Sequence, residues 1–147
     1  MIINVHRNLA EDQRGAAAVE LTLLVPALLL ILGLLVAGGR LWFARTTVNE
    51  AAQTAARAAS LARSSAAATT AGRDAGSQSL VTAGLRCRST SVSISTAAFA
   101  VPVGTPSTVT STILCVVDFS DVFLPGGPGS VQLTGRGSAA LDTYRSR

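Results

Sequence analysis

The dominant hydrophobic pattern is an apolar run near the start of the chain. Between Ala16 and Gly39 there are 24 residues with one charged side chain, that of Glu20. As an α-helix, this run would extend about 36 Å at ~1.5 Å per residue, enough to cross a hydrocarbon core of about 30 Å. A buried helix of a soluble protein would need a partner core, and the rest of the chain is too short and too polar to provide one. The run therefore predicts a membrane-spanning helix over residues 16–39.

A narrower pattern follows the run. Small, mostly alanine side chains recur at spacings of three and four between Leu41 and Ala62, which is typical of one stripe on a helix. The stripe permits close packing, either against another subunit or against the protein's own domain, and the sequence leaves both open. Trp42 and Phe43 come directly after the apolar run, as an aromatic pair at a membrane interface does.

Glycines mark the expected end of this helix. We expect it to continue to about Ala71 and to break at Gly72 and Gly76, with a shorter helix over 77–83. Gly84 then stands at a plausible C-cap position.

From Cys87 onward the period changes to that of β-strands. Residues 88–95, 107–119 and 130–142 alternate or are rich in β-branched side chains, and turn signals separate them at 101–106 and 124–129. The pattern predicts an antiparallel sheet whose apolar face the preceding helix covers. The fold class is therefore α+β, a long membrane helix continuing into an alanine-rich helix packed on a small sheet.

These elements predict four segments. They are a short leader (1–15), a transmembrane helix (16–39), a helical arm (40–84) and a small antiparallel β domain (85–147).

Charge adds little to this organisation. All twelve basic residues are arginines, and the net charge of +4 is spread along the chain without the aromatic interleaving of a nucleic-acid surface. No nucleic-acid partner is expected. Two arginines precede the apolar run and two follow it closely, so the positive-inside rule does not orient it.

The two cysteines suggest an orientation. Cys87 and Cys115 both follow the apolar run, and neither belongs to a metal-binding CxxC motif. Either they form one disulfide or they are two unrelated buried thiols. A disulfide would stabilise the fold by about 3–4 kcal/mol and would place this part of the chain in an oxidising compartment, outside the cytoplasm.

Catalytic residues are not expected. The single histidine, His6, precedes the apolar run, so the serines beyond it have no histidine or lysine base beside them. Asp118 and Asp121 flank a turn, where capping roles are favoured over acid–base or Ca²⁺ roles. We expect no enzyme activity, no cofactor and no metal site.

The position of Glu20 indicates a processing site. If a peptidase cut between Gly15 and Ala16, the new α-amino group would be mostly protonated, with a pKa of about 8. Glu20, the fifth residue of the mature chain, would neutralise this ammonium in its own chain or in a neighbour. The alternative is an uncleaved chain in which Glu20 pairs with Arg14.

These residues resemble a known family. A glycine followed at the fifth mature position by glutamate is the pattern of type IV-type prepilin leaders. The segment 14–63 is similar to TadE-like proteins, the pseudopilin-type minor components of tight-adherence (Flp/Tad) pili. The matching positions are Arg14, Gly15, Val19, Glu20, Pro26, Gly39, Arg40, Trp42 and the arm from Val48 to Arg63. Leu21 departs from the major pilins, which have an aromatic residue there, and this favours a minor subunit.

The resemblance implies a function and partners. It implies cleavage after Gly15 by a prepilin peptidase, and a structural role with other pilin or pseudopilin subunits and the Tad assembly machinery. The protein would be a single-pass component of the bacterial cytoplasmic membrane, with its N-terminus cytoplasmic and its C-terminal domain outside, or incorporated into a pilus. Two other interpretations stay open: an uncleaved membrane-anchored adaptor, and a secreted binding module released near Ala37.

Pro26 lies well inside the predicted membrane helix. Because proline has no backbone N–H, a local bend is expected there, which neighbouring helices would accommodate. A tolerated proline without a role is the alternative.

Overall fold

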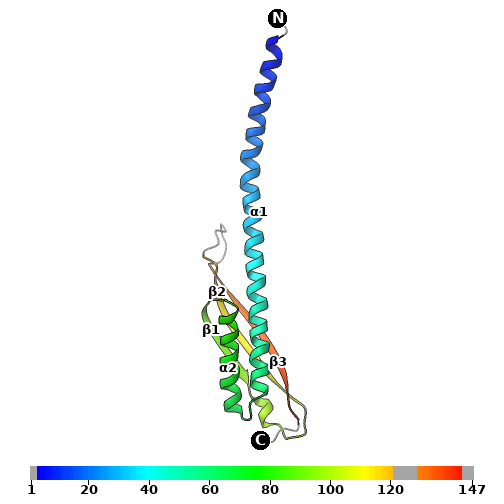
Figure 1. The fold of residues 1–147 in the computed structure, drawn as a ribbon, viewed down its shortest axis with the longest axis vertical. Helices are drawn as coiled ribbons and strands as arrows, with labels where there is room; N and C mark the ends of the chain where they lie inside the picture. Colours follow the sequence, from blue (N-terminus) through cyan, green and yellow to red (C-terminus); the bar gives the residue numbers. More distant parts are fainter. Residues whose placement is uncertain (1–2, 121–128, 144–147) are drawn as a thin grey trace. The chain divides into compact units, whose positions relative to one another are not determined.

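The computed structural model describes residues 3–120 and 129–143, with side chains from residue 19 onward. The chain forms two compact units, Met1–Gly38 and Gly39–Arg147. The described residues contain two helices, a short 3-10 helix and three strands, which confirms the α+β class (Figure 1). In chain order they are α1 (Ile3–Ser60), α2 (Ser65–Thr82), β1 (Cys87–Ser95), η1 (Ala97–Ala100), β2 (Ser107–Asp118) and β3 (Ser130–Leu141).

The expected helix boundary near Gly72 is wrong. Helix α1 ends at Ser60, and α2 begins at Ser65. Ser64 has an extended backbone, and its hydroxyl accepts a hydrogen bond from the backbone N–H of Ala67 at 3.2 Å. This N-cap satisfies one of the free N–H groups at the start of α2, so the chain restarts a helix here.

Gly72 and Gly76 lie inside α2 and do not end a helix. Instead, they allow α2 to pack closely against its neighbours. A Cβ atom at Gly72 would lie 2.7 Å from Cδ1 of Ile94 and 3.1 Å from the carbonyl oxygen of Ala55. At Gly76 it would lie 3.1 Å from the Cβ of Ala55. The two glycines lie one turn apart and let α2 approach both α1 and the sheet. This contact outweighs their low helix propensity of about 1 kcal/mol each.

Gly84 ends α2, as the sequence indicates. Its φ of 72° is left-handed, and it follows the C-cap residue Ala83. The N–H of Gly84 donates to Val81 at 3.0 Å, and that of Leu85 donates to Leu80 at 3.0 Å. This is a Schellman motif, which glycine adopts without the steric cost of a Cβ.

The three strands form one antiparallel sheet in the order β1-β2-β3. Ile113 of the central strand is paired with Val92 of β1 and with Gly135 of β3. Buried and exposed residues alternate along β2 and β3, as expected for a sheet with one covered face. The turn expected at 101–106 is present, with Gly104 at a φ of 96°. The turn expected at 124–129 falls largely outside the described residues.

Helices α1 and α2 cover the same face of this sheet, and the alanine stripe of α1 is buried against it (Figure 1). Its residues share a core with side chains of β2, β3 and α2. That cluster contains Ala44, Val48, Ala51, Ala52, Ala55, Leu80, Ile113, Cys115, Val117 and Leu133. Of the two possibilities left open by the sequence, the stripe packs on the protein's own domain.

Glycines of β3 bring the sheet close to the α1 backbone. A Cβ at Gly135 would overlap the carbonyl group of Val48, and one at Gly137 would overlap that of Ala52. The buried hydroxyl of Ser111 donates a hydrogen bond to the Ala52 carbonyl at 2.5 Å. The side-chain oxygen of Gln53 accepts one from the N–H of Ser138 at 3.3 Å. Helix and sheet therefore meet through backbone atoms as well as through side chains.

Candidate functional site

The large apolar side chains of α1 that the structure describes before Gly38 are exposed. Large side chains from Val19 to Val36 are 46–72% exposed. The helix contains an 18-residue window with a mean hydropathy of 2.6, none of it buried. By length and composition, α1 is able to cross a membrane.

The residues of the expected processing site lie within α1. Gly15, Ala16 and Glu20 fall between its bounds, although the side chains of the first two lie outside the described part. Glu20 is exposed. Ala16 and Glu20 stand four positions apart, about one helical turn. The helix therefore brings the expected new terminus and the carboxylate to the same face.

Pro26 lies inside α1, and the assigned helix continues through it. The ring removes one backbone hydrogen bond but does not end the helix in this structure. Its expected bend and its role stay predictions.

The aromatic pair after the apolar run is accessible. Trp42 is 74% exposed and Phe43 is 56% exposed. Both precede the part of α1 that is buried against the sheet, which begins with Ala44. Exposed aromatic rings at this position fit a membrane interface.

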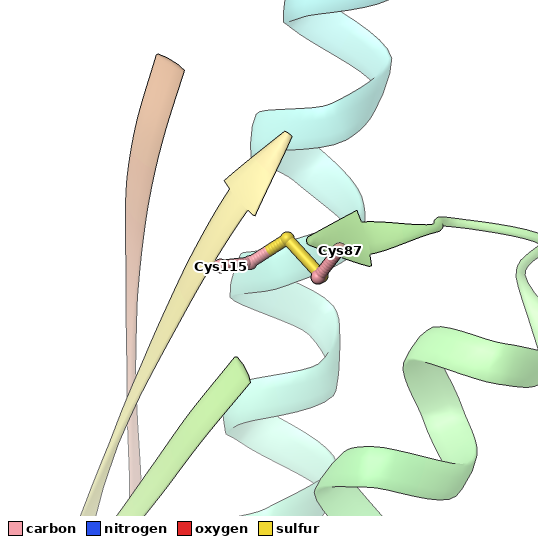
Figure 2. The surroundings of a disulfide bond; sticks show 2 residues. All are labelled: Cys87 and Cys115. Atoms are coloured by element: carbon pink, nitrogen blue, oxygen red, sulfur yellow. A yellow bond between two sulfur atoms is a disulfide. The ribbon is translucent and has the colours of Figure 1, made fainter. Parts of the chain in front are cut away.

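The expected disulfide is present. Cys87 at the start of β1 is bonded to Cys115 in the middle of β2, with Cα atoms 5.4 Å apart (Figure 2). Figure 2 shows the bridge beside α1, and Cys115 is fully buried in the core. The bond links positions 28 residues apart and ties the edge strand to the centre of the sheet.

Asp118 is the described carboxylate with a clear electrostatic perturbation. The pKa of its side chain lies below the ordinary value of 3.8. The main cause is the hydrogen bond that the carboxylate accepts from the backbone N–H of Ser120. The Ser120 hydroxyl and Arg88 also favour the ionised form and lower the pKa further. The N–H of Ser120 lies 2.9 Å from Oδ1. This arrangement fits the capping role expected at the turn after β2, while Asp121 lies outside the described residues.

The described side chains form no metal-binding group. Among them, no group of three histidine, cysteine or carboxylate residues is placed to hold a metal ion. The described residues bring together three structural features. They are an exposed apolar helix, a disulfide and a closely packed helix–sheet core.

Two features were not anticipated from the sequence. One is the contact of Gly135 and Gly137 with the α1 backbone, signalled only by two glycines at a spacing of two, which face the same side of a strand. The other is a pocket that brings Arg40 together with Arg86. Its two arginines lie far apart in the chain, so no local pattern connects them.

Comparison with known proteins supports the reading of the N-terminal part. Residues 15–57 match the family model of TadE-like proteins, which confirms the resemblance over this segment. The matched segment begins at Gly15 and includes Glu20, Pro26 and most of the alanine stripe. Neither the curated proteins nor the solved structures contain a match to this chain.

Proposed function

We propose, from the TadE-like segment over residues 15–57, that this protein is a minor pilin or pseudopilin of a Tad-type pilus or related secretion system. In this role the apolar part of α1 lies in the cytoplasmic membrane or in the helical core of a filament. The unit formed by residues 39–147 is a folded domain outside the cytoplasm. The observation that supports this most directly is the family match on a helix whose large apolar side chains from Val19 to Val36 are exposed.

Processing by a prepilin peptidase after Gly15 is part of the proposal. Cleavage would convert Ala16 into the first residue, with a protonated amino group at the start of an apolar helix. Desolvating that charge in the membrane is costly, and Glu20 on the same helix face offers the compensating carboxylate. Pairing with a neighbouring subunit instead of the same chain would fix the axial register between two helices.

The disulfide supports the orientation. A bond between Cys87 and Cys115 persists in an oxidising compartment, which favours a cytoplasmic N-terminus and an extracytoplasmic C-terminal domain. The one apolar helix among the described residues that is long enough to cross a membrane supports the proposed single-pass arrangement.

The proposed role is structural, without enzyme activity. Assembly would rely on packing of the apolar helix with helices of other subunits and with the pilus machinery, for which the exposed side chains from Val19 to Val36 are available. The alanine stripe of α1 is already covered by the sheet and is not available for this contact.

N-terminal sequencing of the protein purified from membranes tests the proposal. A mature chain that begins at Ala16 supports prepilin processing. A chain that begins at Met1 would instead indicate an uncleaved membrane adaptor, and one that begins near Gly39 would indicate a secreted module. Either of the last two results contradicts the pilin assignment.

A further inference from the structure

The domain contains a pocket at the point where α1 enters it. The pocket has a volume of 610 Å³ and lies within the unit formed by residues 39–147. Its walls come from α1, from the link between α2 and β1, and from the end of β2. Residues that define its chemistry are Arg40, Phe43, Leu85, Arg86, Asp118 and Phe119.

This lining is amphipathic. Phe43, Leu85 and Phe119 supply apolar surface, and Arg40 and Arg86 supply two guanidinium groups from separate elements. Arginine binds phosphate oxygens through a planar set of donors, and aliphatic or aromatic surface beside it suits an acyl chain. A small inorganic anion would use only the guanidinium groups and would leave the apolar wall without a function.

The carboxylate among the described lining residues, that of Asp118, already accepts a hydrogen bond. Asp118 accepts the N–H of Ser120 at 2.9 Å, and Arg88 acts on it electrostatically. The described lining carries two arginines and one carboxylate. Charge complementarity therefore favours an anionic occupant.

The position along the chain identifies the source of that anion. Arg40 is the first residue after the apolar run, and Trp42 and Phe43 follow within one helical turn. A residue at this point of a membrane helix lies at the level of the lipid headgroups. Basic side chains there are attracted to anionic lipids.

We propose that this pocket binds the phosphodiester headgroup of an anionic glycerophospholipid, with Arg40 and Arg86 on the phosphate and Phe43, Leu85 and Phe119 against the upper acyl chain. The inference rests on the membrane placement given under the proposed function. It adds a lipid-binding site in the extracytoplasmic domain that would fix the domain at the membrane surface before assembly.

Trp42 provides the test, because it is the only tryptophan in the chain and lies beside Phe43. The full-length protein is reconstituted into vesicles of phosphatidylcholine with a minor fraction of phosphatidylglycerol. In paired samples one lipid or the other has bromine on its upper acyl carbons, and quenching of Trp42 fluorescence is measured. We expect phosphatidylglycerol to be enriched around Trp42 about fivefold over its bulk fraction, the effect of roughly one well-placed arginine.

Variants separate the pocket from general surface charge. Arg40→Gln with Arg86→Gln should reduce the enrichment to the bulk ratio. Arg57→Gln, which removes an exposed arginine of α1 outside the pocket lining, should leave it unchanged. An equal loss in the Arg57 variant would overturn the pocket assignment.

The remaining outcomes are distinct. Quenching in proportion to bulk composition would show an inserted protein without the lipid site, and would overturn this inference alone. Loss of the enrichment on adding inorganic phosphate at constant ionic strength would show a site for free anions and overturn the lipid assignment. Absence of quenching by either lipid would contradict the membrane placement, and with it both proposals.

Discussion

The backbone carbonyl of Ala52 in α1 lies directly against Gly137 of β3, with no room for a side chain between them. The same carbonyl accepts the buried hydroxyl of Ser111. This part of the core is therefore defined by how closely a helix backbone approaches a sheet.

Replacing Gly137 with alanine should destabilise the domain. The added Cβ would overlap backbone atoms of Ala52 and Gln53, which cannot rotate away, so the helix must move off the sheet. We expect a loss on the order of 3 kcal/mol, at the upper end of the usual cost of overpacking. Hydrogen exchange of β2 and β3 amides in detergent-solubilised protein measures it, with faster exchange expected in both strands.

Gly129→Ala is the matched control. A Cβ at this glycine meets no atom within 4 Å. The substitution should leave exchange unchanged or slightly slower, because alanine reduces the freedom of the unfolded chain. Similar exchange in the two variants would show that the contact at Gly137 does not limit stability.

Gly72→Ala should destabilise the domain even though alanine favours helix. The new methyl group would lie 2.7 Å from Cδ1 of Ile94. Ile94→Val removes that Cδ1 atom, so the double variant should recover part of the loss. We expect a favourable coupling of about 1 kcal/mol in a double-mutant cycle measured by thermal unfolding. Strict additivity would mean that the two residues do not meet in solution.

Removing the disulfide should weaken the domain. Replacing both cysteines with alanine releases a constraint between positions 28 residues apart. On the chain-entropy model the expected loss is about 3–4 kcal/mol, and the buried position of Cys115 adds a packing cost. Alkylation without reductant should leave the mass of the wild-type protein unchanged. A mass increase of two adducts would show free thiols and remove this argument for an extracytoplasmic domain.

Glu20→Ala should leave membrane insertion intact and impair assembly. The substitution makes the helix more apolar, so insertion does not suffer, but the mature ammonium loses its partner. Membrane fractionation and counting of surface filaments separate the two effects, with Glu50→Ala on the same helix as a control for loss of a carboxylate. Normal filament formation by the Glu20 variant would refute the charge-pairing role.

Asp118 should titrate below 3.8, because a backbone N–H, a hydroxyl and Arg88 all favour its ionised form. A pKa that is lower in the folded state than the value of about 3.9 in the unfolded chain stabilises the fold above that value. This contribution is lost as the pH falls through the folded-state pKa. NMR titration of the carboxyl carbon measures it. Ser120→Ala should raise the pKa only partly, since the larger cause, the backbone N–H, remains; a full return to 3.8 would contradict this order.

Local periodicity was enough to predict the strands and the apolar helix, and residue type was enough to indicate the helix end at Gly84. It failed at Gly72 and Gly76, because a glycine that breaks a helix and a glycine that allows close packing look the same until the partner is known. Ile94 and Ala55, which give these glycines their role, lie in other elements. Ser64, whose hydroxyl caps α2, is a residue type that favours helix N-caps and marks this boundary in the sequence.

Some features of the candidate site are visible in the sequence, and others depend on tertiary structure. The Gly15–Glu20 spacing and the two cysteines are visible in the sequence, because their significance depends on residue type and on position relative to one apolar run. Arg40 and Arg86 line one pocket because α1, the link after α2 and the end of β2 meet there. Tertiary structure alone brings these two arginines together.

The contacts of Gly135 and Gly137 in β3 with the α1 backbone also affect when the domain can fold. Gln53 and Ser138 are bonded across 85 positions of sequence, and Val48 and Ala52 rest on glycines comparably far along the chain. During synthesis α1 is made long before β3, so the part of its alanine stripe that contacts Gly135 and Gly137 stays uncovered until that strand emerges. Contacts of such long range slow folding. If the domain lies outside the cytoplasm, as proposed, these contacts would form only after β3 had crossed the membrane, so the chain would be translocated before the helix–sheet core is complete.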